Sequence, residues 1–481
     1  MFYRLSLILS ILFISFLGRA QESYVYDIKV KLKGITETSK PIHLAHYYGN
    51  SQFLKVDSAK AENGVIRFKG KAGLQGGMYV VVLSASKYYD FLVSGTESEF
   101  TIEADTADFL NTVKFTGSKE NEVLYNYRKY ISDKTKDAMA IQKALQTNKE
   151  PEAQEANKKK MKGMQEEVTG YIKNTIKANE GFFAAKIIKV NMEPELPTEV
   201  PILANGRKDS TFMYRTYKKK FFENLDFSDE RFIRTPFLQT KLEKYFKDLV
   251  YQVTDSITAD ADRVLLMSKK HKEMYRYTLW FLSNKYENIN IIGLDGVFVH
   301  LAENHYLKDA DWMDATQKNK IQERVDILKP IITGKVMPLL ILQDTLGRDV
   351  NLMDIKAKYT VVYFYRYDCG HCQDHAPELM KFYDETKDKG IAIYHAGTHE
   401  TGDMEEELTK TKAFIKKYKT VRLINVLDLK LRYDFRKRYD VYKTPTIYIL
   451  DSEKRILAKG IPLEEIKGFI EFHEKKMTAK R

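Results

Sequence analysis

The pattern of apolar and polar positions changes twice along the chain and divides it into three regions after a short leader. Between residues 21 and 117, apolar residues alternate with polar ones in short runs. The clearest runs begin at Tyr26, Val65, Tyr79 and Phe100. Turn residues such as Asn63-Gly64 and Gly76-Gly77 separate them, as is typical of half-buried strands. The pattern predicts an N-terminal antiparallel β-sandwich without a visible catalytic cluster.

The middle region, residues 118–330, has a helical period. Apolar residues near its start share one helical face: Val123, Leu124, Tyr127 and Ile131. The charged stretch 147–177 indicates long solvated helices, and amphipathic segments follow at 237–253 and 274–286. We therefore expect a central all-α region.

Two histidines of this region, His300 and His305, stand in a run that resembles a metalloprotease signature. Residues five apart on a regular α-helix are rotated by about 140° from each other. We therefore expect these histidines to pack or to face solvent, and not to share one metal ion.

Strands and helices alternate in the last region, residues 331–481, after a junction at residues 330–338. Strands are predicted at residues 339–342, 350–352, 359–365, 391–394, 423–427, 446–450 and 456–459. Helices are predicted after Cys369 and at residues 404–418, 431–439 and 464–477. This order predicts an α/β domain with a mixed sheet that begins with a hairpin.

The composition is that of a folded protein. Of 481 residues, 43% are hydrophobic and 12% aromatic, which argues against extensive disorder. The net charge of +12 includes lysine clusters at residues 158–160 and 218–220. No stripe alternates base-stacking aromatic residues with arginine, so we interpret the clusters as solvated helix faces and expect no nucleic-acid partner.

The first residues have the layout of an export signal. Arg4 precedes an apolar stretch at residues 5–17, and Gly18-Arg19-Ala20 supplies small residues for cleavage. We expect a signal peptide at residues 1–20 and a mature chain from Gln21. No cysteine follows the cleavage point and no later segment is long and apolar enough to span a bilayer. The expected product is therefore a periplasmic or envelope protein that is neither a lipoprotein nor membrane-spanning.

The only cysteines of the chain stand together in Cys369-Gly370-His371-Cys372, between a predicted strand and a predicted helix. In an oxidising compartment a single C-x-x-C pair indicates dithiol redox chemistry. Cys369 would lie at the helix N-terminus, where the helix dipole and a protonated His371 favour a thiolate. Asp368 would oppose this effect.

The order of these elements, with C-G-H-C after the first main strand and Thr444-Pro445 before a late strand, resembles the thioredoxin superfamily. The hairpin, the leader and Pro377 are similar to the TlpA/ResA-type envelope thiol-disulfide oxidoreductases, over about residues 333–475. The regions before residue 331 resemble accessory regions that carry no known activity.

The resemblance implies a C-terminal thioredoxin fold, no cofactor, and partners that are protein thiols or disulfides together with an electron donor or acceptor. Cys369 would form a mixed disulfide with a substrate, and Cys372 would resolve it. Thr444 and Pro445 resemble the family's cis-proline loop, beside which an extended substrate pairs. His375 and Glu378 could relay a proton to Cys372.

The sequence also departs from the family. Asp368 replaces the usual aromatic residue before the first cysteine, and Tyr363 stands where an acid is often buried. His375 stands where many ResA-type proteins have glutamate, so we expect that proton handling is rerouted.

Three other chemistries compete with this reading. Cys369, Cys372 and His375 could hold zinc, but no fourth ligand is evident. Covalent haem needs a histidine where Gln373 stands, and a peroxidase needs a hydroxyl where Arg366 stands.

The direction of the redox reaction stays open at this point. C-G-H-C resembles the motif of disulfide isomerases, whereas the domain type resembles reductases, which we favour. A binding or scaffold protein with secondary redox activity is the alternative from another class.

Overall fold

The computed structural model describes residues 25–35, 40–84, 86–287, 293–399 and 403–479. The leader predicted at residues 1–20 lies outside them. The chain forms two compact units. The first holds the described residues up to 226 and residues 231–241, and the second holds residues 227–230 and 242 onward.

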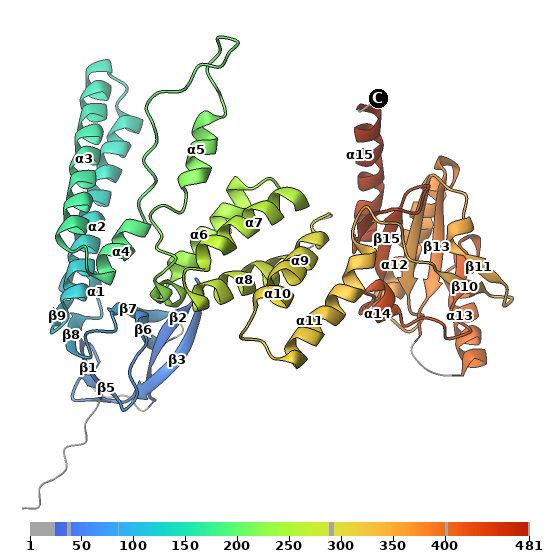
Figure 1. The fold of residues 1–481 in the computed structure, drawn as a ribbon, viewed down its shortest axis with the longest axis horizontal. Helices are drawn as coiled ribbons and strands as arrows, with labels where there is room; N and C mark the ends of the chain where they lie inside the picture. Colours follow the sequence, from blue (N-terminus) through green and yellow to red (C-terminus); the bar gives the residue numbers. More distant parts are fainter. Residues whose placement is uncertain (1–24, 36–39, 85, 288–292, 400–402, 480–481) are drawn as a thin grey trace, which may run out of the picture. The chain divides into compact units, whose positions relative to one another are not determined.

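Strands of the first unit form sheets that share one core (Figure 1). Across one sheet the order is β4 (Ala61–Glu62), β5 (Val65–Gly70), β1 (Tyr26–Lys33), β8 (Glu99–Asp105) and β9 (Lys114–Thr116). Across the other it is β3 (Gln52–Ala59), β2 (Ile42–Tyr48), β6 (Gly77–Ser84) and β7 (Lys87–Val93). Ile28 of β1, Leu44 of β2 and Val81 of β6 lie in the same buried cluster. The predicted N-terminal β-structure is therefore present.

One strand pair differs from the prediction. We expected antiparallel pairing throughout, but β1 and β8 run parallel, with Asp27 opposite Glu99. Alternation of apolar and polar residues shows which face of a strand is buried, but it carries no information about strand direction. The chain passes through the other sheet between β1 and β8, which allows it to return in the same direction.

The helices of the first unit include a long hairpin. They are α1 (Phe109–Thr112), α2 (Lys119–Thr147), α3 (Pro151–Ala178), α4 (Phe183–Val190) and α5 (Phe212–Lys220). Figure 1 shows α2 and α3 side by side. Tyr130 and Tyr171 stack at 3.7 Å between ring centroids, and Lys134 pairs with Glu167 at 2.8 Å. Most of the remaining hairpin surface is charged and exposed, as its composition predicts.

Helices of the second unit precede its sheet. The unit boundary falls within α6 (Pro236–Lys244), and a π-helical turn, η2 (Tyr245–Leu249), follows it. The next helices are α7 (Thr254–Ser268), α8 (Lys272–Glu287), α9 (Asp295–Leu301), α10 (Leu307–Asp309) and α11 (Ala315–Leu328). Among the described helices, none combines the length and apolar character that a bilayer span requires.

The C-terminal sheet is mixed and carries the site. Its order is β11 (Asp349–Asn351), β10 (Ile341–Asp344), β14 (Ile424–Leu427), β13 (Ile391–Gly397), β12 (Tyr359–Tyr365), β15 (Thr446–Leu450) and β16 (Ile456–Lys459). Its helices are α12 (Gly370–Thr386), α13 (Met404–Lys417), α14 (Phe435–Tyr439) and α15 (Ile466–Ala479). The predicted alternation of strands and helices is confirmed, and it agrees with a thioredoxin fold.

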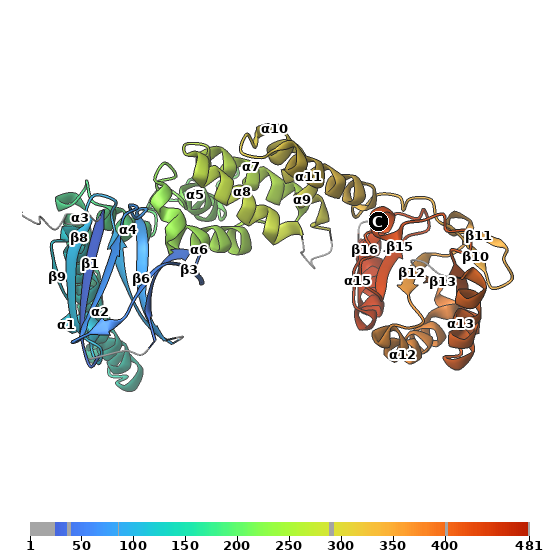
Figure 2. The same cartoon turned by 90° about the horizontal axis from the view of Figure 1, so that it is seen from below.

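Every residue of β12 is buried, which explains its unbroken apolar run. Val361 and Tyr363 face a core that includes side chains of α12, α13 and α15, which surround the strands in Figure 2. Val362 and Phe364 face the opposite core, with side chains of α14. Helix α14 begins later than predicted because Asp434 caps it.

β13 contains a buried histidine, His395. The His395 ring stacks on Tyr365 at 3.7 Å between centroids, and its Nδ1 lies 2.8 Å from Asn425 Oδ1. Both side-chain amide protons of Asn425 are donated to backbone carbonyls, so its oxygen faces the ring and accepts a hydrogen bond from Nδ1–H. Burial lowers the pKa of His395 to about 4.

We predict that this histidine reduces the free energy of unfolding at low pH. Unfolded, it takes up a proton near pH 6.5, but folded only near pH 4, so stability is complete above 6.5 and falls towards 4. The loss between pH 7 and pH 4 is roughly 3 kcal/mol larger than in a His395→Phe variant. Urea titrations, monitored by hydrogen exchange in β12 and β13, give the free energy of unfolding of both proteins at each pH. A difference between them that does not change with pH would contradict the prediction.

Candidate functional site: a dithiol at the start of helix α12

The two cysteines lie where β12 ends and α12 begins. Cys369 is the N-cap residue of α12, and its backbone N–H donates to the carbonyl of Arg366 at 3.3 Å, which closes the turn after the strand. The Cys369 side chain is partly exposed, whereas Cys372, in the first turn of the helix, is 1% exposed. The C-G-H-C segment therefore presents one thiol to solvent and holds the other in the core.

A loop distant in sequence completes the site. β15 pairs with β12 so that Thr446 lies opposite Phe364, and the residues just before β15 therefore reach the cysteines. The Cys369 thiol donates to the backbone carbonyl of Thr444 at 3.2 Å. The Thr444–Pro445 peptide bond is cis, as predicted.

The two thiols differ in acidity. Burial raises the pKa of the Cys372 thiol to about 12. Burial opposes ionisation of Cys369 as well, but hydrogen bonds from the side chains of Thr444 and Cys372 and from the backbone N–H groups of Cys372 and His371 outweigh it. The pKa of Cys369 is therefore below its usual value, as expected for a thiol at a helix N-terminus.

Asp368 was expected to oppose this ionisation, but it is paired. The Arg366 guanidinium donates two hydrogen bonds to its carboxylate, at 2.9 and 2.8 Å. The hydrogen bonds from Arg366 hold the pKa of Asp368 below its usual value. The negative charge beside Cys369 is therefore offset by an equal positive charge.

The other predicted site residues lie on α12 near the cysteines. His371 and Glu378 are exposed, and His375 is partly buried. The Nδ1 atom of His375 is buried and has no hydrogen-bond partner among the described residues. Their roles in proton transfer stay predictions.

Tyr363 is a site residue that the sequence analysis noted only as a departure from the family, without assigning it a role. Its side chain is 1% exposed, and its hydroxyl has no hydrogen-bond partner within the described part of the chain. Burial raises the pKa of Tyr363, and the charges of Cys372, Cys369 and Glu378 raise it further. Its side chain shares a buried cluster with Cys372, against which Cys369 packs. The available signal was the spacing within β12, which puts Tyr363 on the face that packs against α12.

A groove of about 700 Å³ adjoins the exposed thiol. Arg366 and Thr444, which flank Cys369, are part of its wall. The remaining wall carries basic side chains together with apolar ones: Arg432, Arg436, Lys443, Leu431, Phe435, Val441 and Tyr442. Leu431 and Tyr442 are 57% and 58% exposed, which leaves apolar surface beside the cysteines.

Comparison with known protein families assigns each region. The AhpC/TSA family matches residues 333–459. Two domains of unknown function match parts of the remaining chain, DUF4369 at residues 26–124 and DUF5106 at residues 145–330.

Curated relatives match the C-terminal region. Thiol-disulfide oxidoreductase ResA of Bacillus cereus (strain ATCC 10987) is 26% identical over 151 residues, which are 30% of this chain and 78% of the relative. ResA of Bacillus anthracis is 25% identical over 149 residues.

Solved structures match the same region. A domain of a possible thiol-disulfide isomerase from Cytophaga hutchinsonii is 35% identical, covers 31% of this chain and 98% of its own, and has a TM-score of 0.29. The thioredoxin domain of a thiol-disulfide oxidoreductase from Bacteroides vulgatus is 31% identical, covers 29% of this chain and 96% of its own, and has a TM-score of 0.26.

We predict that the two cysteines differ strongly in reactivity at pH 7. Only the thiolate is alkylated, and the thiolate fraction of Cys372 is very small because its pKa is about 12. Iodoacetamide should therefore modify the Cys372→Ser variant, which keeps Cys369, at least about 100-fold faster than the Cys369→Ser variant. Mass spectrometry of timed samples measures both rates. Equal rates would contradict the assigned asymmetry.

Proposed function

Because this chain belongs to the thioredoxin superfamily, with a ResA-like thiol-disulfide oxidoreductase domain at its C-terminus, we propose that it exchanges disulfides with envelope proteins through Cys369 and Cys372. The unequal burial and acidity of the two thiols carry this proposal. An exposed acidic thiol can attack a substrate, while a buried thiol of high pKa remains protonated until the second step.

In the direction that we favour, the substrate is reduced. The Cys369 thiolate attacks one sulfur of a substrate disulfide, forms a mixed disulfide and releases a substrate thiolate, which takes up a proton. Cys372 then loses its proton and attacks the Cys369 sulfur, which releases the second substrate thiolate. The substrate gains two electrons, and the enzyme keeps a Cys369–Cys372 disulfide that an external dithiol must reduce.

The second step needs a group to accept the Cys372 proton. The imidazole of His375 lies one helical turn from Cys372, and its Nδ1 has no other partner among the described residues, so we assign it this relay. The hydroxyl of Tyr363 stays protonated at neutral pH because its pKa is raised, so it cannot accept the proton of Cys372.

The surroundings of Cys369 fit an extended polypeptide. The carbonyl of Thr444 can accept a hydrogen bond from a substrate backbone N–H once the thiol is consumed. Pro445 has no backbone N–H, so at this position the loop donates no hydrogen bond to the substrate backbone. Exposed Leu431 and Tyr442 offer apolar contacts in the adjoining groove.

We place this reaction in the cell envelope and favour the reductase direction. The leader pattern at residues 1–20, outside the described residues, supports the location. The overall similarity to ResA supports the direction, whereas the C-G-H-C motif and the Cytophaga hutchinsonii domain of a possible thiol-disulfide isomerase support an oxidase or isomerase as the alternative.

The two serine variants test the assignment of attacking and resolving thiols. Both should lose at least about 100-fold in turnover of a protein disulfide such as insulin. Only Cys372→Ser should accumulate a mixed disulfide with the substrate, because nothing resolves it. Non-reducing gels after acid quenching, with the double variant as control, measure the trapped species. Accumulation in Cys369→Ser alone would reverse the assignment.

The midpoint potential of the Cys369–Cys372 couple tests the direction. We expect a value near −270 mV, which is typical of a reducing dithiol. Equilibration with glutathione and dithiothreitol buffers, read by alkylation and mass spectrometry, gives the potential. A value of about −120 to −180 mV would instead assign the oxidase or isomerase role.

A further inference from the structure

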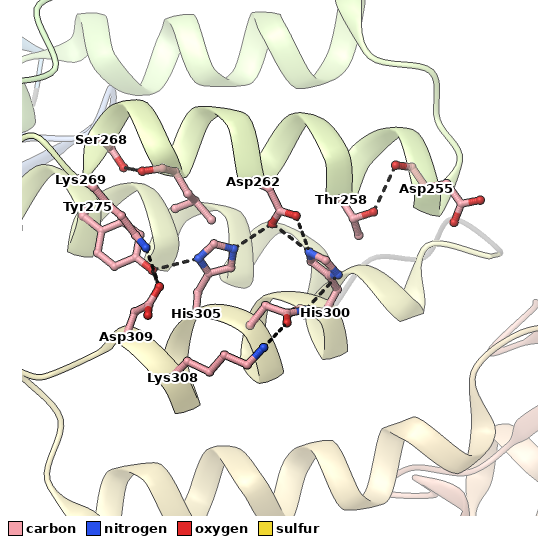
Figure 3. Close-up of polar contacts among 12 residues, drawn as sticks. Asp255, Thr258, Asp262, Ser268, Lys269, Tyr275, His300, His305, Lys308 and Asp309 are labelled. Carbon is pink, nitrogen blue, oxygen red and sulfur yellow. Dashed lines mark hydrogen bonds and ion pairs between the residues drawn. The ribbon is translucent and has the colours of Figure 1, made fainter.

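A π-helical turn brings together two histidines that the sequence analysis had separated. Helix α9 ends at Leu301, and a π-helical turn, η3 (Ala302–Tyr306), continues it into α10. A π-helical turn contains more residues than an α-helical one, because its hydrogen bonds run from i to i+5. His300 and His305 are therefore on the same side and both face α7 (Figure 3). The expectation that they cannot approach one ion is wrong, because it assumed regular α-helix.

The two rings converge on one carboxylate. Nε2 of His300 lies 2.9 Å and Nε2 of His305 lies 2.8 Å from Oδ1 of Asp262, on α7. One ligand atom from each of the three residues falls within 4.8 Å of the other two.

We propose that Asp262, His300 and His305 bind a divalent transition-metal ion, with Zn²⁺ as the preferred ion. Two imidazole nitrogens and one carboxylate oxygen are donors that zinc accepts. Metal–ligand bonds of about 2.0–2.2 Å place tetrahedral donors about 3.3–3.5 Å apart. The hydrogen-bonded donors therefore need to separate by only about half an ångström to admit the ion.

Outer contacts orient His305 for this role. Its Nδ1 lies 2.9 Å from Tyr275 Oη, and the Tyr275 hydroxyl donates to Asp309 Oδ2 at 3.4 Å. Lys269 Nζ lies 2.6 Å from the same Asp309 oxygen and fixes it in place. With its proton directed to Asp309, the Tyr275 oxygen can accept Nδ1–H of His305 once the ion has displaced the Nε2 proton directed at Asp262, which leaves the Nε2 lone pair for the metal.

His300 needs one rearrangement. The Asn304 amide donates to His300 Nδ1 at 3.2 Å, which leaves the ring proton on Nε2, directed at Asp262. Metal binding displaces that proton, the tautomer with Nδ1–H forms, and the Asn304 side chain turns over so that its oxygen accepts from Nδ1–H. Lys308 Nζ, which donates to Asn304 Oδ1 at 2.8 Å, then gives up this hydrogen bond and donates to solvent.

The fourth coordination position faces solvent. The side chain of His305 is only 10% exposed, whereas those of His300 and Asp262 are 29% and 45% exposed. A water molecule can complete the tetrahedron from that side. The ion then fastens α7 to the turn between α9 and α10. The site lies outside the thioredoxin-like domain, so it stands or falls independently of the proposed function.

The test uses the full chain with Cys369→Ser and Cys372→Ser, so that no thiol binds metal. After removal of metal with EDTA, calorimetric titration with ZnCl₂ should show one equivalent bound per chain. Asp262→Asn, His300→Gln and His305→Gln should each weaken binding by at least about 10-fold to 100-fold. His271→Gln is the matched control, because His271 lies in the turn between α7 and α8, outside the cluster, and the variant should bind zinc unchanged.

A spectroscopic readout on unaltered histidines covers the case in which a variant does not fold. In ¹⁵N-histidine NMR spectra, one equivalent of Zn²⁺ should shift the Nε2 signals of His300 and His305 and leave that of His271 in place. Three results would each overturn the proposal: no stoichiometric binding, binding unaffected by the three variants, or tighter retention of Mn²⁺ than of Zn²⁺.

Discussion

The double-sided burial of β12 is the constraint on which the redox site depends. Its register with β15 places the Thr444 carbonyl beside Cys369, and its last residue, Tyr365, leads directly into the turn that exposes that cysteine. Because cores on both faces hold the strand, a shift of register would move both thiols and the loop together. The precision of the site is therefore a property of the packed sheet and not of the C-G-H-C segment alone.

Much of the C-terminal domain could be predicted because its signals are local. The sequence shows the apolar run of β12 and the C-G-H-C segment at the start of α12. It also shows the short apolar runs that end at turn residues. The shielding of Cys372 agrees with its place inside the first turn of the helix, whereas Cys369 is the N-cap residue. The contact between Cys369 and Thr444 joins residues 75 positions apart in sequence. Only the family resemblance, and no local pattern, predicted that these residues meet.

The remainder could not be predicted, because it depends on non-local geometry. The pairing of Arg366 with Asp368 offsets the expected effect of an acid beside Cys369, and it depends on side-chain directions that a sequence pattern does not contain. The packing of Tyr363 in the same buried cluster as Cys372 could not be predicted for the same reason. The prediction that His300 and His305 cannot approach one ion failed because of a single π-helical turn, since arguments from periodicity assume a regular α-helix.

The parallel pairing of β1 with β8 has a consequence for the order in which the first unit assembles. β1 lies between β5 and β8, so its partners are separated from it by tens of residues along the chain. The entropy of closing loops of this length is lost before the sheet gains its hydrogen bonds, which slows nucleation. β1 is synthesised before both of its partners and is thus among the last of these strands to find its place.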